Sequence, residues 1–234
     1  MPHISKSCVV SNGIDTDRFS KRGKDYSLME KIGLKPDFKT LLYLGRLDSE
    51  KNVDVIIKSM VYLQGKLNVQ MIIAGSGSCS ENLKELADSL GVSNLIHFTG
   101  YVDDDVVPRL YNLSDIYLIA STAELQSITT LEAMSCTLPV IAADSNALKD
   151  IVKHGWNGYL FEPGNSRELS KYVDSLLSHQ DLYDKMSQNA RTSACEHDIK
   201  NTGRKYEEIY RSLLRLKNKN IISRNNKSSR MAEI

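Results

Sequence analysis

The chain has 234 residues, of which 41% are hydrophobic, 25% charged and 7% aromatic, with a formal net charge of +1. This length and balance suit one large domain, or a domain with an appendage, and exclude a disordered, collagen-like or fibrous protein. The near-zero net charge disfavours a basic nucleic-acid-binding protein.

Six short apolar runs, rich in β-branched residues, are predicted to be strands. Most are apolar throughout, which is typical of strands covered on both faces of a parallel sheet. They span residues 40–44, 69–74, 95–98, 116–120, 139–142 and 158–161. Longer helical patterns separate them, for example an apolar stripe in 53–60 and another in 83–90 that ends at Gly91. The alternation predicts a doubly wound α/β domain with right-handed crossovers.

Three further helices are expected after the last strand. The first follows a cap at Asn165 or Ser166 and runs to about residue 177; the others cover roughly 182–194 and 199–216. We therefore place one domain at 1–216. Residues 217–234 carry a net charge of +4 and are predicted to be a disordered basic tail, with weak attraction to anionic lipid as the minor alternative.

The cysteines and the N-terminus indicate a cytoplasmic protein. Cys8, Cys79, Cys136 and Cys195 lie far apart without a CxxC pair, so we expect reduced core thiols. Neither they nor the five scattered histidines suggest a zinc site. No apolar run approaches the roughly 20 residues of a membrane span, and no signal-peptide core is seen.

Ligands of such sheets bind beyond the carboxyl ends of the strands, so chemistry is sought there. After the first strand, Gly45 allows close approach to the backbone, and Arg46 and Lys51 flank a turn at a helix start. This arrangement suits a diphosphate. The alternative is that both residues are ordinary surface cations.

The second strand ends in a glycine turn containing Gly75 and Gly77. It is half of a dinucleotide-binding fingerprint, without the third glycine and after the second strand instead of the first. It is weak evidence for NAD. A bare backbone near a nucleotide and a plain turn are equally compatible with it.

Two carboxylates eight residues apart, Glu124 and Glu132, bracket a hydroxyl-rich segment after the fourth strand. Free amides around Ser127, Ile128 and Thr129 would form an anion site at a helix start. Glu124 could accept hydrogen bonds from sugar hydroxyls. Thr129 and Glu132 also have the spacing of a capping box, which would give Glu132 a structural role instead.

These landmarks resemble, in order and spacing, the C-terminal donor-binding domain of retaining GT-B glycosyltransferases, family four or group one. The resemblance covers about residues 8–215. It rests on VSNGID at 10–15, LGRLDSEKN at 44–52, AGSG at 74–77, FTGYV at 98–102, the 124–132 segment, LPVIA at 138–142 and NGYLFEPG at 157–164.

The resemblance implies a role for each candidate residue. Arg46 and Lys51 would neutralise the donor diphosphate without a metal or other cofactor, and Glu124 would lie near the transferred sugar. Glu132 would hold the ribose hydroxyls, and the amides near Ser127, Ile128 and Thr129 would bind phosphate. Gly45, Gly75, Gly77 and the backbone of Tyr101 and Val102 would shape the nucleotide pocket. The substrate would be a UDP- or GDP-linked hexose, transferred with retention of configuration.

Two departures from the family pattern shape the remaining expectations. The segment between the glutamates is usually glycine-rich, but here it contains Leu125, Gln126 and Ser127. The acceptor-binding N-terminal domain of the family is also missing from the chain, so it is expected in cis or as a partner in trans, as in a split enzyme. Peripheral membrane contact of the whole enzyme stays open.

Rival functions come from other classes. A non-catalytic nucleotide-sugar-binding or interaction module is the main alternative. A GT-B epimerase or phosphorylase is a smaller one, and an NAD-dependent Rossmann enzyme is disfavoured by the missing third glycine and acid.

Overall fold

A six-stranded parallel sheet forms the centre of the molecule. The computed structural model describes residues 8–145 and 147–231, with side chains up to residue 215. The strands are β1 (Lys39–Leu44), β2 (Val69–Ala74), β3 (Ile96–Gly100), β4 (Ile116–Ile119), β5 (Val140–Ala143) and β6 (Gly158–Phe161). They lie in the order β3-β2-β1-β4-β5-β6, with every neighbouring pair parallel. The predicted doubly wound α/β fold is confirmed.

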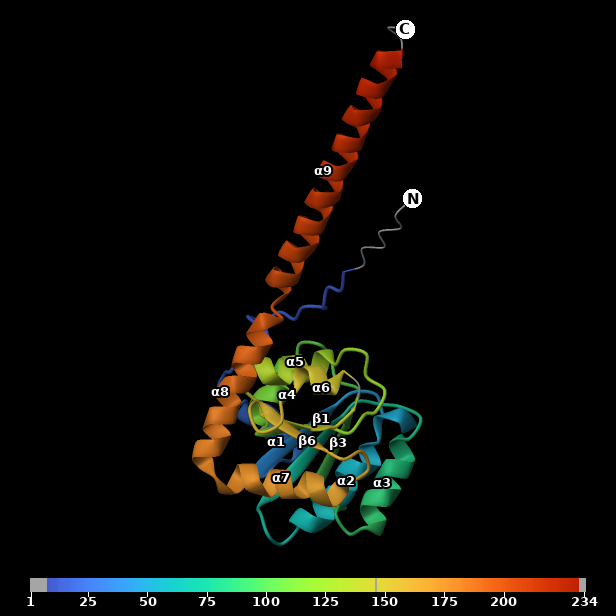
Figure 1. Cartoon of the computed structure of the whole chain (residues 1–234). Helices are drawn as coiled ribbons and strands as arrows, with labels where there is room; N and C mark the ends of the chain where they lie inside the picture. The colour runs from blue at the N-terminus through green and yellow to red at the C-terminus, as the bar shows by residue number, and fades with distance from the viewer. Residues whose placement is uncertain (1–7, 146, 232–234) are drawn as a thin grey trace.

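Helices cover both faces of the sheet (Figure 1). Alternate residues of each strand point to opposite faces, so Leu41 and Tyr43 join one buried cluster and Leu42 joins the other. The first face packs against α2 (Val53–Leu63), α3 (Ser80–Ser89) and α7 (Ser166–Ser178). The second packs against α1 (Tyr26–Ile32), α4 (Val107–Leu113), α5 (Ile128–Ser135) and α6 (Leu148–Ile151). Short 3-10 turns lie at Ser49–Lys51 and Ser93–Leu95.

The C-terminal helices differ from one another in how they meet this body. Helix α8 (Gln180–Glu196) buries Met186, Ala190 and Ala194. Helix α9 (Ile199–Met231) rises away from the body (Figure 1). It continues past the expected end at residue 216, because no glycine or proline follows Gly203 to break it. The disorder expected for 217–234 stays a prediction, since its side chains and residues 232–234 lie outside the described part.

The N-terminal segment is fastened to the joint between α8 and α9. Ile14 forms a parallel bridge with Asp198, in which the Ile14 amide donates to the His197 carbonyl and the Ile199 amide donates to the Ile14 carbonyl, both at 2.9 Å. Arg191 of α8 also donates to the carbonyls of Phe19 and Ser135. The segment around Ile14 therefore lies beside the junction of α8 and α9.

The expectation of four core thiols was only partly right. None of the cysteines is in a disulfide, but Cys136 alone is fully buried, while Cys8 and Cys195 are exposed. Burial raises the pKa of the Cys136 thiol to about 12. Among the described residues, no helix is both long and apolar enough to cross a membrane.

Candidate functional site

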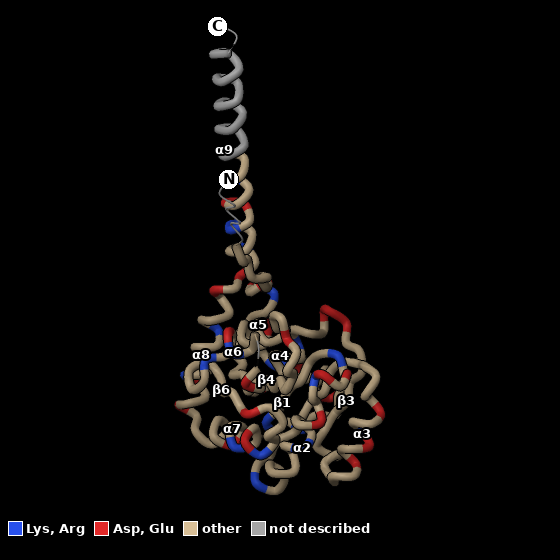
Figure 2. Tube along the Cα trace, turned by 45° about the vertical axis from the view of Figure 1, so that its right-hand side comes forward, with Lys and Arg blue, Asp and Glu red and all other residues tan. Residues whose placement is uncertain are grey.

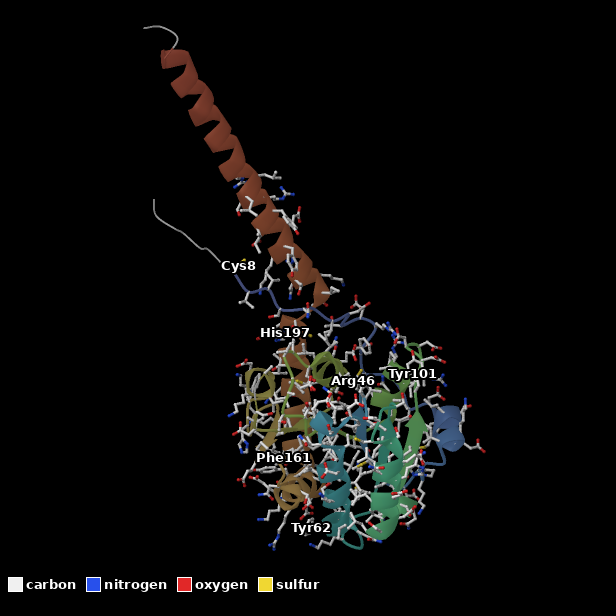
Figure 3. The ribbon with its side chains drawn as sticks, turned by 90° about the vertical axis from the view of Figure 1, so that its right-hand side faces the viewer. Cys8, Arg46, Tyr62, Tyr101, Phe161 and His197 are labelled. Carbon is white, nitrogen blue, oxygen red and sulfur yellow. The ribbon has the colours of Figure 1, made fainter. Side chains whose placement is uncertain are left out.

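The strand order reverses between β1 and β4, and the predicted residues follow these two strands. Two adjoining cavities of about 200 and 260 Å³ open there and share Leu44, Gly45, Arg46 and Thr129. The smaller reaches Lys51 and Glu124, and the larger reaches Gly75 and Tyr101. A crevice at the reversal point is where open α/β sheets bind ligands. Arg46 and Tyr101 lie at the end of the body nearest the base of α9, and Tyr62 at the opposite end (Figure 3).

Lys51 and Glu124 form an ion pair across the smaller cavity. The Lys51 Nζ lies 2.7 Å from Glu124 Oε1, and the side chains are 17% and 15% exposed. Asn52 has a φ of 49°, and its side-chain Nδ2 donates to the Ala120 carbonyl at 3.2 Å. It thereby joins the loop after β1 to the loop after β4. The proximity of Lys51 and Glu124 fits their predicted roles, because a diphosphate beside Lys51 would place its sugar close to Glu124.

Arg46 borders both cavities but is held by carboxylates. Its guanidinium lies 2.5 Å from Asp48 and 2.8 Å from Glu50, and its side chain is 69% exposed. Asp48 is fixed by the Ser78 amide and hydroxyl, which lower the pKa of its carboxyl. An incoming polyanion would therefore have to replace carboxylate partners of Arg46.

The first turn of α5 faces the smaller cavity without a side-chain cap. Ser127 is the N-cap residue, but its hydroxyl pairs with that of Thr130 at 2.8 Å. The first amides of a helix have no intrahelical acceptor, so those of Ile128 and Thr129 are available to an anion. The hydroxyl of the buried Tyr117 donates a hydrogen bond to the Thr129 Oγ1 at 2.9 Å and so holds the Thr129 side chain.

Glu132 does not form the capping box that its spacing allowed. Helix α5 starts at Ile128, so Thr129 lies inside it and Glu132 is beyond the first turn. The carboxylate instead accepts a hydrogen bond from Tyr111 at 3.0 Å. Burial raises the pKa of Glu132 to about 7, although the Tyr111 hydroxyl and the Arg18 charge oppose the shift. It does not line either cavity.

The two glycines of the turn after β2 have different surroundings. Gly75 borders the larger cavity at a φ of +133°, where an added Cβ would lie 1.9 Å from the Gly45 carbonyl oxygen. Gly77 does not line the cavities; a Cβ there would lie 2.5 Å from the Leu47 backbone. Tyr101, which is 76% exposed, and Val102 also line the larger cavity.

Two residues near the site were not assigned a role from the sequence. Tyr43 donates to the Arg46 carbonyl at 2.7 Å and lines the smaller cavity. Gln126 lines the same cavity and bonds the backbone of Asn12. A tyrosine near the end of an apolar strand looks like core. For Gln126 there was one indication in the sequence: it lies in a segment that is usually glycine-rich in the family.

Charge is spread over the body in both signs (Figure 2). The site thus presents Lys51, Arg46 and free helix amides for negative charge, and Glu124 for donors. Together these groups can bind a molecule that carries both phosphate and hydroxyl groups.

Comparisons with known proteins agree with this chemistry. The family described as "Glycosyl transferases group 1" matches residues 26–193. An uncharacterized glycosyltransferase, MJ1607, of Methanocaldococcus jannaschii is 31% identical over 80% of this chain and 49% of its own length. The alpha-monoglucosyldiacylglycerol synthase of Acholeplasma laidlawii is 26% identical over 94% of this chain and 56% of its own.

Solved structures share the fold. Anabaena HepE in complex with UDP and glucose has a TM-score of 0.81 and 25% identity, covering 88% of this chain and 56% of HepE. The chain spans about half the length of the curated relatives that it matches. On the family match, the parallel sheet and the site at its reversal point, the chain belongs to the glycosyl transferases group 1 family.

Proposed function

We propose that the cleft binds a UDP- or GDP-linked hexose and, together with an acceptor-binding domain in cis or in trans, transfers the hexose with retention of configuration. The Lys51–Glu124 pair carries the proposal, because it sets a cation for phosphate beside a carboxylate for sugar hydroxyls. UDP is favoured over GDP, since HepE was solved with UDP and with UDP-glucose.

Charge stabilisation explains the arrangement of the cations. When the bond between the anomeric carbon and the diphosphate breaks, negative charge builds up on the leaving phosphate. Lys51, Arg46 and the α5 amides would lie around that charge, and such pre-oriented groups are a large source of catalysis. No metal is needed in this scheme, so we expect binding and transfer to persist in EDTA.

The acceptor must approach on the face that the nucleotide leaves for configuration to be retained. Leu125, 97% exposed, follows Glu124 on the loop after β4, and Tyr101 stands exposed beside the larger cavity. Both present apolar surface that a second domain could cover. Such a domain would bring the acceptor hydroxyl to the anomeric carbon.

Calorimetric titration of the chain with UDP, GDP and NAD tests the binding part. We expect a uridine or guanosine diphosphate to bind and NAD not to. Lys51→Ala should weaken binding at least about tenfold, because it removes a charge-assisted contact and leaves Glu124 unpaired near the phosphate. Lys58→Ala is the matched control, since Lys58 pairs with Asp54 on the surface of α2. Equal affinities of the two variants would contradict the site.

Transfer is tested in the enzyme reconstituted with its acceptor domain. Glu124→Gln keeps the shape of the side chain but removes its charge, and we expect kcat to fall about 100-fold or more. Proton NMR of the product gives the anomeric configuration. An inverted product would contradict retention, and full activity of Glu124→Gln would remove Glu124 from the mechanism.

A further inference from the structure

The side-chain amide of Gln126 pairs with the backbone of a residue 114 positions earlier. Its Oε1 accepts from the Asn12 amide at 3.0 Å, and its Nε2 donates to the Asn12 carbonyl at 2.9 Å. An amide side chain offers one donor and one acceptor side by side, as a neighbouring strand does. Gln126 therefore holds the N-terminal segment from the side of the donor loop, which we define as residues 123–127.

The same N-terminal segment is held from its other side by the α8–α9 joint. Besides the Ile14 bridge, the Thr16 hydroxyl donates to the Asp198 carboxylate. Gly13 packs so closely that a Cβ there would lie 2.5 Å from the Ile199 Cα. Residues 12–16 thus lie between the donor loop and the base of α9. Through Gln126 the loop is joined to the N-terminal segment and, by way of that segment, to the α8–α9 joint.

Few contacts hold the central residues of the donor loop. Among the described residues, polar side-chain contacts from 123–126 to distant parts of the fold are the Lys51–Glu124 pair and the Gln126–Asn12 pair. In the proposed function Lys51 also interacts with the diphosphate, and this weakens the ion pair between Lys51 and Glu124. The Gln126 contact is unaffected by that exchange.

We propose that Gln126 is a positioning residue that holds Glu124 at the sugar by fastening the donor loop to Asn12. The inference rests on the proposed function, because it assigns Glu124 to the sugar of the donor. It follows that Gln126 contributes to recognition of the sugar and not of the nucleotide. In the proposed function the nucleotide lies against Gly75 and the first turn of α5. Contacts other than the Asn12 pair hold these two places: the Gly75 amide donates to the Gly100 carbonyl, and the Tyr117 hydroxyl donates to Thr129.

Hydrogen exchange of the unliganded full chain tests the contact itself. In Gln126→Ala the Asn12 amide should exchange about fivefold faster, as expected for losing one hydrogen bond of about 1 kcal/mol. Gln126→Glu keeps an acceptor for the Asn12 amide but cannot donate to the Asn12 carbonyl, so it should speed exchange less than Gln126→Ala does. Gln64→Ala is the matched control; Gln64 bonds the Gly91 carbonyl far from the site. Unchanged exchange at Asn12 in Gln126→Ala would overturn the inference.

Calorimetry with UDP, GDP and their sugar-linked forms (UDP-glucose, UDP-galactose, UDP-N-acetylglucosamine and GDP-mannose) tests the consequence. Gln126→Ala should bind the free nucleotide like the wild type but lose about fivefold to tenfold in affinity for the best nucleotide sugar. An equal loss for both ligands, or no loss for either, overturns the inference while leaving the proposed function intact. A wild type that binds none of these ligands overturns the proposed function and the sugar role of Gln126 together, whatever the exchange data show.

Discussion

At the residue scale, Glu132 is a partly buried carboxylate with a raised pKa. It accepts a hydrogen bond from Tyr111, whose hydroxyl also lies 3.1 Å from the Thr129 carbonyl. Burial raises the pKa of Glu132 to about 7. A single phenolic proton cannot satisfy both acceptors fully, so the ionised carboxylate keeps unused acceptor capacity.

The raised pKa of Glu132 predicts how stability depends on pH. Between about pH 4.5 and 7 the unfolded chain ionises Glu132 while the folded chain keeps it protonated. The contribution of Glu132 to the free energy of unfolding therefore falls as pH rises through this window. Glu132→Gln removes the penalty and keeps an acceptor for Tyr111. We expect it to be more stable than wild type at pH 8, on the order of 2 kcal/mol, and similar to it near pH 4.

Urea unfolding of both proteins at pH 4, 6 and 8 measures this difference. Other groups titrate alike in the two proteins, so the difference between them isolates Glu132. A gain of the same size at every pH would show that the variant acts through packing and that Glu132 has an ordinary pKa.

At the element scale, two turns must nearly touch to form the cleft. The Gly45 amide donates to the Ala74 carbonyl at 3.0 Å, and the Gly75 amide donates to the Gly100 carbonyl at 2.8 Å. The ends of β1, β2 and β3 are thereby brought together beneath the larger cavity. Only a residue without a Cβ fits at 75, since the Gly45 carbonyl occupies that space.

Gly75→Ala is therefore expected to destabilise the domain by about 3 kcal/mol or more, from both the overlap and the positive φ. Gly65→Ala provides the control, because Gly65 has a φ of +74° but nothing within 4 Å of an added Cβ. It should cost about 1 kcal/mol. Thermal unfolding and soluble yield compare the two variants. Equal losses would show that the β1 and β2 turns can separate without cost.

The strands were predictable because a sheet buried on both faces needs continuous apolar runs. For five of the six strands, both the first and the last residue lie within one position of the expected bounds. The third starts at Ile96 and reaches Gly100, since the preceding Leu95 belongs to a 3-10 turn. Local pattern also offered Asn165 or Ser166 as the cap of α7, and the cap is Asn165, whose side chain accepts from the Glu168 amide.

Contacts between distant segments were beyond local pattern. Ser127 and Thr129 are both acceptable N-cap residues for α5. The Thr129 hydroxyl instead accepts a hydrogen bond from Tyr117, twelve residues earlier, and Ser127 is the N-cap residue. Nothing near Gln126 in the sequence indicates Asn12 as its partner. The family resemblance supplied the pairing of Arg46 and Lys51 with a phosphate, but not the carboxylates that now hold Arg46.

At the scale of the whole molecule, α9 stands apart from the domain that it follows. Tyr206, Tyr210, Leu213 and Leu214 are between 43% and 64% exposed, although they share one side of the helix. The described side chains of α9 that bond the body lie in its first turn, where Lys200 pairs with Asp17 and Thr202 donates to the Ser11 carbonyl. The domain therefore gains little stability from the helix beyond that turn.

A chain that ends at Arg204 should accordingly melt within about 2 °C of the full chain, because the deleted side chains that are described are exposed, apart from the half-buried Ile209. A chain that ends at Gln188 is the control. It loses the buried Ala190 and Ala194 and the bonds of Arg191 to Phe19 and Ser135, so it should unfold or lose most of its stability. Thermal unfolding followed by circular dichroism distinguishes the two. A drop of more than about 5 °C in the Arg204 chain would mean that α9 packs against the body in solution, and its apolar side would then belong to the domain and not to a partner.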